Sequence, residues 1–212
     1  MGMRRRLWYL FHRRRTPLLD LKGRKKVAPI LKPIAAGMAK VGFTPAAVTI
    51  LGLLTTFVGA GLIASGELLI GGAVAAFGVA LDALDGPLAR HKGTVSDKGA
   101  FLDTMSDRFG EIAVLIGLAV YLSDEHRLLV LCIIGLAFSL LIPYIRSKAE
   151  LSGLVGKGGW MGRAERMILI LVGVMVIGMG LEIMEPLLWV FVVLTGFTVF
   201  QRIRKTWQQL DS

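Results

Sequence analysis

Long apolar runs alternate with short polar or glycine-containing breaks along most of the chain. The runs predict six helices, each close to the roughly 20 apolar residues that cross a bilayer, at about residues 46–64, 68–90, 98–122, 128–149, 163–181 and 187–204. Ahead of the first run, Thr44 is suited to cap a helix and Pro45 to occupy its first position, where a missing N–H is harmless. The pattern therefore predicts an all-α integral membrane protein with six transmembrane helices.

An amphipathic stretch from Val27 to Val41 precedes these runs. Its apolar stripe contains Val27, Ile30, Leu31, Ile34 and Met38. We expect a juxtamembrane helix lying on the inner membrane surface. Residues 1–24, rich in arginine and aromatic side chains, are expected to form a basic interfacial segment. Residues 25–212 would then form one membrane domain, because no loop is long enough to hold another.

Composition supports the membrane assignment. Of the 212 residues 54% are hydrophobic and 19% are charged, and the mean hydropathy is +0.65, which is unusual for a soluble domain. The single cysteine, Cys132, lies in an apolar run, which excludes a disulfide framework within the chain and a thiolate metal site.

The net charge of +10 is distributed as a membrane would require. Residues 1–45, the loop 90–98, the segment 146–166 and the tail from Arg202 carry 12, 3, 5 and 3 lysines or arginines, whereas the opposite turns carry only Arg127. By the positive-inside rule, both termini and the loop 90–98 face the cytoplasm. The distribution argues for contact with lipid and against nucleic-acid binding.

Four acids interrupt the apolar pattern between Leu81 and Glu111. Asp82 and Asp85 are three residues apart and Asp103 and Asp107 are four apart, so each pair would share one face of a helix. The short polar stretch 91–98 would bring the two helices side by side. Four converging carboxylates at a membrane edge require neutralisation, and oxygen-only ligands favour Mg²⁺, Mn²⁺ or Ca²⁺ over zinc.

Small residues and one arginine accompany the acids. Gly86, Ala89 and Gly99 leave space beside the backbone, and Arg90 can hold a phosphate oxygen with its planar fork. Carboxylates that bridge two cations about 3.5–4 Å apart are a common device for displacement at phosphorus. The stretch therefore predicts phosphoryl chemistry on a substrate with a nucleotide or diphosphate head and a lipid tail.

The order and gaps of these residues resemble the signature of the CDP-alcohol phosphotransferase family. The matching pattern is Asp82-x2-Asp85-Gly86-x2-Ala89-Arg90-x8-Gly99-x3-Asp103-x3-Asp107. The resemblance implies two Mg²⁺ or Mn²⁺ ions bound by Asp82, Asp85, Asp103 and Asp107, with Asp107 also accepting a proton from an attacking hydroxyl. It implies that the CDP-lipid, such as CDP-diacylglycerol, contacts Thr44, Pro45, Asp82, Gly86, Ala89, Arg90 and Gly99. It further implies release of CMP, a homodimer, and a location in a prokaryotic cytoplasmic membrane.

Cations also gather at the predicted cytoplasmic ends of the later helices, where an anionic acceptor would explain them. The arrangement resembles the inositol-phosphate branch of the family, the phosphatidylinositol phosphate synthases and the archaeal archaetidylinositol phosphate synthases. That resemblance implies an acceptor-phosphate site formed by Arg146, Lys148, Arg163, Arg166 and Arg202.

Three other functions remain open at this point. Within the same family, glycerol 3-phosphate would be the acceptor of a phosphatidylglycerophosphate synthase. A membrane prenyltransferase also uses aspartate-bound Mg²⁺, although it usually has more helices and a second acidic motif. A small cation transporter is disfavoured because the acids lie near one membrane face and not at the midplane.

Overall fold

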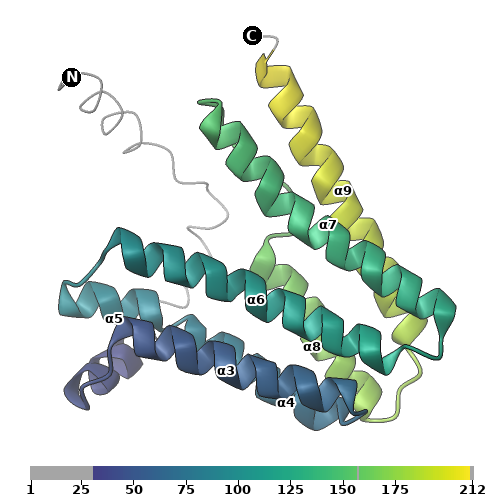
Figure 1. Ribbon diagram of the computed structural model, residues 1–212, viewed down its shortest axis with the longest axis horizontal. Helices are drawn as coiled ribbons and strands as arrows, with labels where there is room; N and C mark the ends of the chain where they lie inside the picture. The colour runs from purple at the N-terminus through teal and green to yellow at the C-terminus, as the bar shows by residue number, and fades with distance from the viewer. Residues whose placement is uncertain (1–30, 157, 211–212) are drawn as a thin grey trace.

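The computed structural model describes residues 31–156 and 158–210, in which the helices are joined by turns and loops and there is no β-strand. A helical segment covers residues 31–40. The helices that follow are α3 (Pro45–Ala64), α4 (Leu68–Asp82), α5 (Asp85–Lys92), α6 (Asp97–Tyr121), α7 (His126–Leu151), α8 (Arg163–Gly178) and α9 (Met184–Leu210) (Figure 1). The expected interfacial segment 1–24 and the start of the amphipathic stretch lie outside the described residues.

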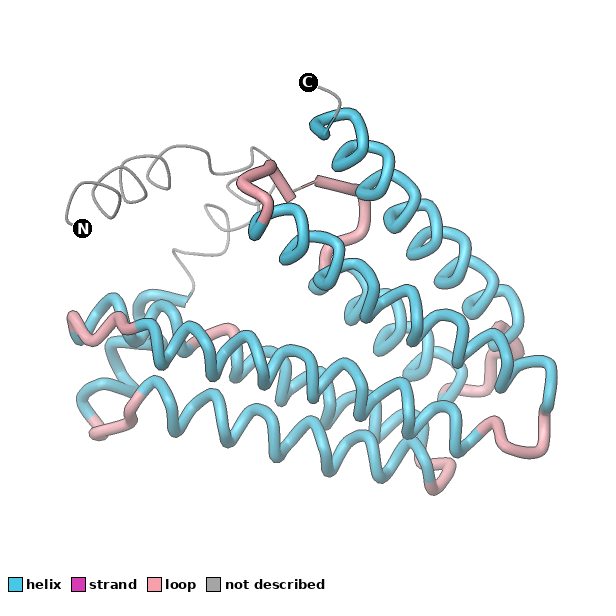
Figure 2. The backbone as a smooth tube through the Cα atoms, turned by 45° about the horizontal axis from the view of Figure 1, so that its top comes forward, coloured by secondary structure: helices cyan, strands magenta, loops and turns pink. Residues whose placement is uncertain are grey.

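The helices pack as two connected groups. Helix α3 packs along α4 and α6, and α8 lies against the far side of α4. Helices α7 and α9 run side by side as a pair, which α6 and α8 join to the first group (Figures 1 and 2). One apolar core extends through both groups, from Ile63 and Val114 to Phe191.

Glycines allow α3 and α4 to approach closely. The sequence predicts that Gly71, Ala75 and Gly78 lie on a buried face of α4, and all three are buried. A Cβ atom at Gly78 would lie 2.6 Å from the Gly52 carbonyl oxygen, and one at Gly52 would lie 2.9 Å from the Asp82 nitrogen. Small residues permit such contact between helix backbones in a membrane, and here the contact positions Asp82 against α3.

Replacing Gly59 by alanine is expected to destabilise this helix pair by about 1–3 kcal/mol, the usual range for overpacking. A methyl group there would overlap the Ala75 backbone and lie 2.7 Å from the Gly71 carbonyl oxygen. Thermal unfolding of the purified protein in detergent would measure the loss. Gly61→Ala is the matched control on the same helix, because nothing lies within 4 Å of a Cβ there. An equal response of the two variants would contradict the prediction.

The predicted helix 68–90 is wrong in one respect, because it is broken into α4 and α5 at Ala83 and Leu84. Pro87 explains the break. In a continuous helix its nitrogen would face the carbonyl of Ala83 without a hydrogen to donate, and its ring would clash with that carbonyl. In the structure Pro87 is the third residue of α5, where no donor is required. Asp82 thus ends one helix and Asp85 begins the next.

Other boundaries agree closely with the sequence or shift by a few residues. Thr44 caps α3 by accepting a hydrogen bond from the Ala47 nitrogen at 3.2 Å, and Pro45 is the first helical residue, as predicted. Helix α8 ends at Gly178, earlier than expected, and α9 extends from Met184 to Leu210. In the amphipathic segment, Leu31 and Met38 of the predicted stripe pack with the buried Ala35 against α3 and α5, whereas Ile34 of that stripe is exposed.

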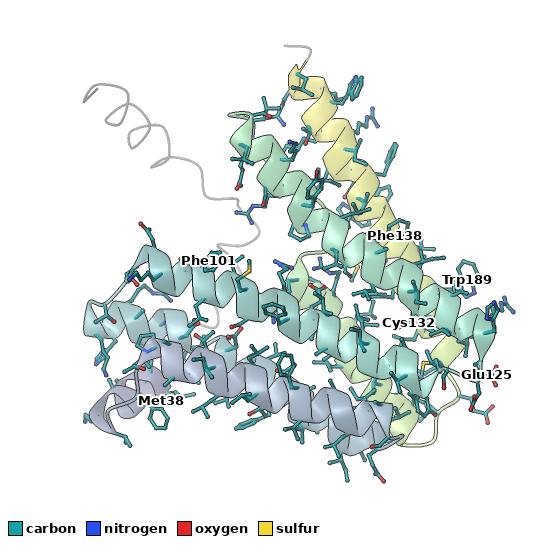
Figure 3. The ribbon with its side chains drawn as sticks, in the orientation of Figure 1. Met38, Phe101, Glu125, Cys132, Phe138 and Trp189 are labelled. Atoms are coloured by element: carbon teal, nitrogen blue, oxygen red, sulfur yellow. The ribbon has the colours of Figure 1, made fainter. Side chains whose placement is uncertain are left out.

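Four of the described helical segments are long and apolar enough to cross a membrane. They are Pro45–Ala64, Leu68–Lys92, His126–Leu151 and Met184–Leu210. Helix α8 has 16 residues, and α6 contains Asp107, Arg108 and Glu111 in its central part. Large apolar side chains project outward along the molecule, including Phe101 on α6 and Trp189 on α9, whereas Cys132 lies inside (Figure 3). Such exposure is typical of a surface that faces lipid.

Candidate metal and anion site

Three of the four predicted acids meet at the break between α4 and α5. Carboxylate oxygens of Asp82, Asp85 and Asp103 all lie within 4.8 Å of one another. Asp82 and Asp85 are only 6% and 9% exposed. The break therefore does not separate the pair that the sequence assigns to one helix face. It turns both carboxylates toward Asp103 on α6.

The acid cluster fits a divalent cation. The Oδ1 atom of Asp82 is buried and has no hydrogen-bond partner among the described residues, and a buried carboxylate oxygen without a partner is costly. Thr49 on α3 donates from its hydroxyl to Asp85 Oδ2 at 2.5 Å, which orients that carboxylate but adds no positive charge. The donors are oxygens only, the ligand type that Mg²⁺ and Mn²⁺ prefer.

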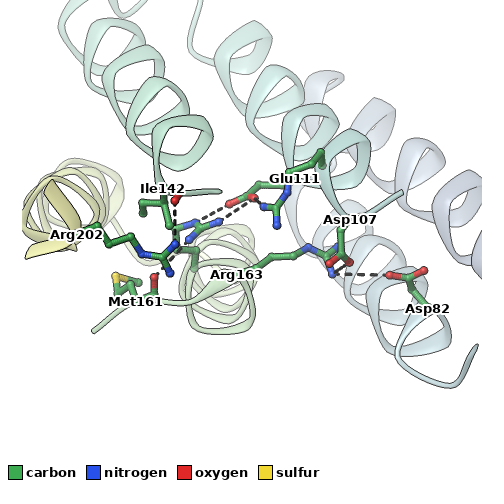
Figure 4. A network of polar contacts seen from close by, with 9 residues as sticks. Asp82, Asp107, Glu111, Ile142, Met161, Arg163 and Arg202 are labelled. Atoms are coloured by element: carbon green, nitrogen blue, oxygen red, sulfur yellow. Dashed lines mark hydrogen bonds and ion pairs between the residues drawn. The ribbon is translucent and has the colours of Figure 1, made fainter. Parts of the chain in front are cut away.

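Asp107 lies one helical turn beyond Asp103 but has a different neighbour. Its carboxylate forms an ion pair with the guanidinium of Arg163, the first residue of α8. The same guanidinium is 3.7 Å from Asp82 Oδ2, so Arg163 links Asp107 to the acid cluster (Figure 4). Among the described residues, Asp107 is not within the group of three converging carboxylates, and its role as a fourth ligand stays a prediction.

The positions assigned to the CDP-lipid lie around the same helix ends. A Cβ atom at Gly86 would be 3.3 Å from Arg90 Nη1, so the Arg90 fork lies over the α5 backbone. The Gly99 nitrogen donates to Ser96 Oγ at 3.2 Å in the cap of α6, and Ala89 is half-buried on α5. Thr44 and Pro45 begin α3, and Lys92 Nζ donates to the Phe43 carbonyl at 2.7 Å. Sequence reasoning missed Thr49 and Lys92, because their partners are distant along the chain.

The arginines and the lysine predicted to bind the acceptor's phosphate lie in different environments. Arg146 pairs with Glu150 at 2.9 Å on the surface of α7, and Lys148 is exposed nearby. Arg202 donates to the carbonyls of Gly158 and Ile142 at 2.9 and 2.8 Å, which fixes its guanidinium between α7 and the loop before α8 (Figure 4). Arg163 instead pairs with Asp107 and lies beside Asp82 of the acid cluster.

Arg166 is placed differently from the sequence expectation. It is 1% exposed and donates to Glu111 through Nε at 2.6 Å and Nη2 at 2.9 Å, and to the Met161 carbonyl at 3.4 Å. This placement favours a structural role for Arg166 over a direct contact with an acceptor. The signal that could have indicated it is the position of Glu111, four residues after Asp107 and on the same face of α6.

The sequence matches the family profile for CDP-alcohol phosphatidyltransferases over residues 43–199. It is 38% identical over 197 residues to the phosphatidylinositol phosphate synthase of Mycobacterium tuberculosis, an alignment that covers 89% of this chain and 91% of that protein. It is 33% identical over 198 residues to the archaetidylinositol phosphate synthase of Pyrococcus horikoshii, with coverage of 90% and 97%.

Solved structures of the M. tuberculosis synthase have a similar fold. The complex with manganese and citrate superimposes with a TM-score of 0.78 at 36% identity, covering 84% of this chain and 88% of the other. The structure with CDP-DAG bound has the same TM-score and identity and covers 84% and 94%.

Proposed function

The chain belongs to the CDP-alcohol phosphatidyltransferase family, and from this premise we propose that it transfers the phosphatidyl group of a CDP-lipid to inositol phosphate and releases CMP. The observation that carries the proposal is the convergence of Asp82, Asp85 and Asp103, with a buried and unpartnered oxygen on Asp82. The names of the relatives and the manganese and CDP-DAG recorded in the related structures support the choice of metal, donor and acceptor.

Asp82, Asp85 and Asp103 would hold the divalent cations, with Asp107 as a further ligand once its carboxylate turns from Arg163. Mg²⁺ or Mn²⁺ bound there neutralises the diphosphate and polarises its oxygens. Thr49 keeps Asp85 in place through the 2.5 Å hydrogen bond. Arg90, over Gly86, would bind an oxygen of the diphosphate, with Ala89, Gly99, Thr44 and Pro45 bordering the CDP-lipid.

In the transfer step, a hydroxyl oxygen of the acceptor forms a bond to the phosphorus that bears the lipid. The bond from that phosphorus to the oxygen shared with the cytidine-linked phosphorus breaks, and CMP leaves with the shared oxygen. The hydroxyl proton passes to the Asp107 carboxylate, which acts as general base. Arg163, between Asp107 and Asp82, is suited to bring the acceptor's phosphate to this side of the acid cluster.

The test is CMP release from CDP-diacylglycerol by the purified protein with Mg²⁺ or Mn²⁺, in separate reactions with inositol phosphate, glycerol 3-phosphate, inositol or serine. We expect release with inositol phosphate to exceed the others by at least about tenfold. Preferential use of glycerol 3-phosphate would replace the acceptor but keep the reaction. Absence of release with every acceptor, in folded protein, would reject the proposed activity and leave the prenyltransferase and transporter alternatives.

For the membrane arrangement, we propose six spans in the cytoplasmic membrane of a prokaryote, with α6 and α8 crossing together with the four longer apolar segments. Both termini and the acid cluster would face the cytoplasm, as the distribution of lysine and arginine favours. Ser123 follows the end of α6 and Ser152 follows the end of α7, and both are exposed. In the proposed arrangement they lie on opposite sides of the membrane, so they form a matched pair for a labelling test. In intact cells, an impermeant maleimide should label Ser123→Cys and not Ser152→Cys; the reverse would overturn the orientation.

The protein is further proposed to act as a homodimer, with residues 25–212 as one membrane domain. This proposal rests on the family resemblance. Light scattering of the protein in detergent would give its mass, and a monomer at all concentrations would reject the dimer.

A further inference from the structure

Glu111 is shared by two arginines in the interior of the bundle. It is 1% exposed and accepts from Arg166 at 2.6 and 2.9 Å, and its Oε2 also accepts from Arg108 Nη1 at 3.1 Å. Arg166 meets Glu111 with the two parallel bonds of a fork, the strongest form of this pair. Arg108 makes one longer bond to an oxygen already used by Arg166. Glu111 is therefore neutralised by Arg166 without any help from Arg108.

Arg108 has capacity for a further ligand. The Nε atom of Arg108 is buried without a hydrogen-bond partner among residues 31–156 and 158–210, as is the Nε atom of Arg163. The side chain of Arg108 is 24% exposed, so it is shielded from most of the solvent that could otherwise satisfy it. Glu111 carries one negative charge for the two guanidinium groups of Arg166 and Arg108, so the group of three keeps one positive charge in a largely buried place. An anion that reaches Arg108 from the open side would balance that charge.

The position of Arg108 connects the two halves of the site. It follows Asp107 directly on α6, and the charges of Glu111 and Asp107 act on it, followed by those of Arg166 and Arg163. Arg202, between α7 and the loop before α8, is in turn within electrostatic range of Arg108, Arg146 and Arg166. Arg108 therefore lies between the acid cluster, reached through Arg163, and the cations of α7 and α9.

We propose that Arg108 is a specificity-determining residue that binds the phosphate of the acceptor, and that Glu111 is the positioning residue that aims its guanidinium. The inference rests on the proposed function and deepens it, since it names a ligand for the acceptor that the motif does not contain. The planar fork of arginine suits a phosphate, and the hydrogen bond from Nη1 to Glu111 fixes one end of the fork, while 24% of the side chain stays exposed. The acceptor's phosphate would thus lie next to Asp107, which receives the proton from the same molecule.

The test compares Arg108→Gln and Arg108→Lys with the wild type in the CMP-release assay. For Arg108→Gln we expect KM for inositol phosphate to rise about tenfold or more, the effect of losing a hydrogen bond between charged groups. KM for CDP-diacylglycerol should stay within about twofold, and Arg108→Lys should recover part of the affinity. Calorimetric Kd values for inositol phosphate provide the same comparison if a variant turns over too slowly. Arg127→Gln is the matched control. Arg127 lies at the start of α7 and forms an exposed ion pair with Glu185 on α9.

An unchanged KM and Kd for inositol phosphate, or equal losses for both substrates, would overturn the role of Arg108 while leaving the proposed function intact. If the wild type uses another phosphorylated acceptor, inositol phosphate is rejected and the same comparison with that acceptor decides the role of Arg108. If the wild type uses only acceptors without a phosphate, both proposals fail.

Discussion

Asp107→Asn is expected to lower kcat for CMP release by about 10²–10⁴-fold, the range for removal of a general acid or base. Asparagine has nearly the same shape but cannot accept the hydroxyl proton. Asp107 is half-buried, and its single identified ion pair, with Arg163, joins it to the acid cluster through a flexible side chain. The substitution should therefore leave the packing of α6 intact. Steady-state kinetics with saturating inositol phosphate would measure the loss.

The distinguishing feature of this prediction is a loss in kcat with little change in KM for CDP-diacylglycerol. Asp124→Asn provides the control, because that acid is exposed in the turn between α6 and α7, far along the chain from the acid cluster. A kcat within about fivefold of the wild type would show that Asp107 is neither the base nor a required ligand, and would move the search for the base to Asp103 or Asp85.

Glu111→Ala is expected to destabilise the protein by about 3–5 kcal/mol, because it removes one partner of a buried ion pair and leaves the other uncompensated. Arg166 is 1% exposed and loses its two hydrogen bonds to Glu111, and Arg108 loses one. Because α8 is joined to α6 through these side chains, we expect the whole α6–α8 contact to loosen. For a chain of this size the loss corresponds to a fall in Tm of about 6–20 °C, measurable by thermal unfolding in detergent.

Two comparisons make this second prediction specific. Glu185→Ala removes the exposed partner of Arg127 and should cost about 1 kcal/mol or less. The double variant Glu111→Leu with Arg166→Met should be more stable than Glu111→Ala alone, because no buried guanidinium of Arg166 is left unpaired. If the single and double variants unfolded at the same temperature, the pair would not contribute as a buried ion pair.

Local signals in the sequence predicted much of the fold. The cap at Thr44 and the glycine-containing turns act within a few residues, so helix starts such as Pro45 and Asp97 lie within a residue of the prediction. The small residues on α4 marked its packing face correctly, because close approach of two helices requires them at helical spacing. The break at Ala83 was missed because the predicted helix was continued from the apolar run through the acids to Arg90, although Pro87 disfavours a continuous helix there.

The candidate site was likewise predicted from the sequence only in part. The spacing of the acids predicted that four carboxylates converge. Asp82, Asp85 and Asp103 do, whereas Asp107 pairs with Arg163. The sequence could not sort the arginines, because Arg146, Arg163, Arg166 and Arg202 all follow the same rule of positive charge at one membrane face. Their environments differ according to the partner that each one meets: Glu150 on the same helix for Arg146, Asp107 for Arg163, Glu111 for Arg166, and two backbone carbonyls for Arg202.

By itself, the sequence determined the helical class, the positions of most helix ends and the acids of the candidate metal site, because periodicity, capping and motif spacing are local properties. Only the tertiary structure decided which acid pairs with Arg163, which arginine is buried with Glu111, and that α7 pairs with α9. These features depend on contacts between residues more than 35 positions apart, such as Glu111 with Arg166. A charge has the same local signal whether it faces lipid headgroups, a ligand or a buried partner, so its role emerges only when the helices are packed.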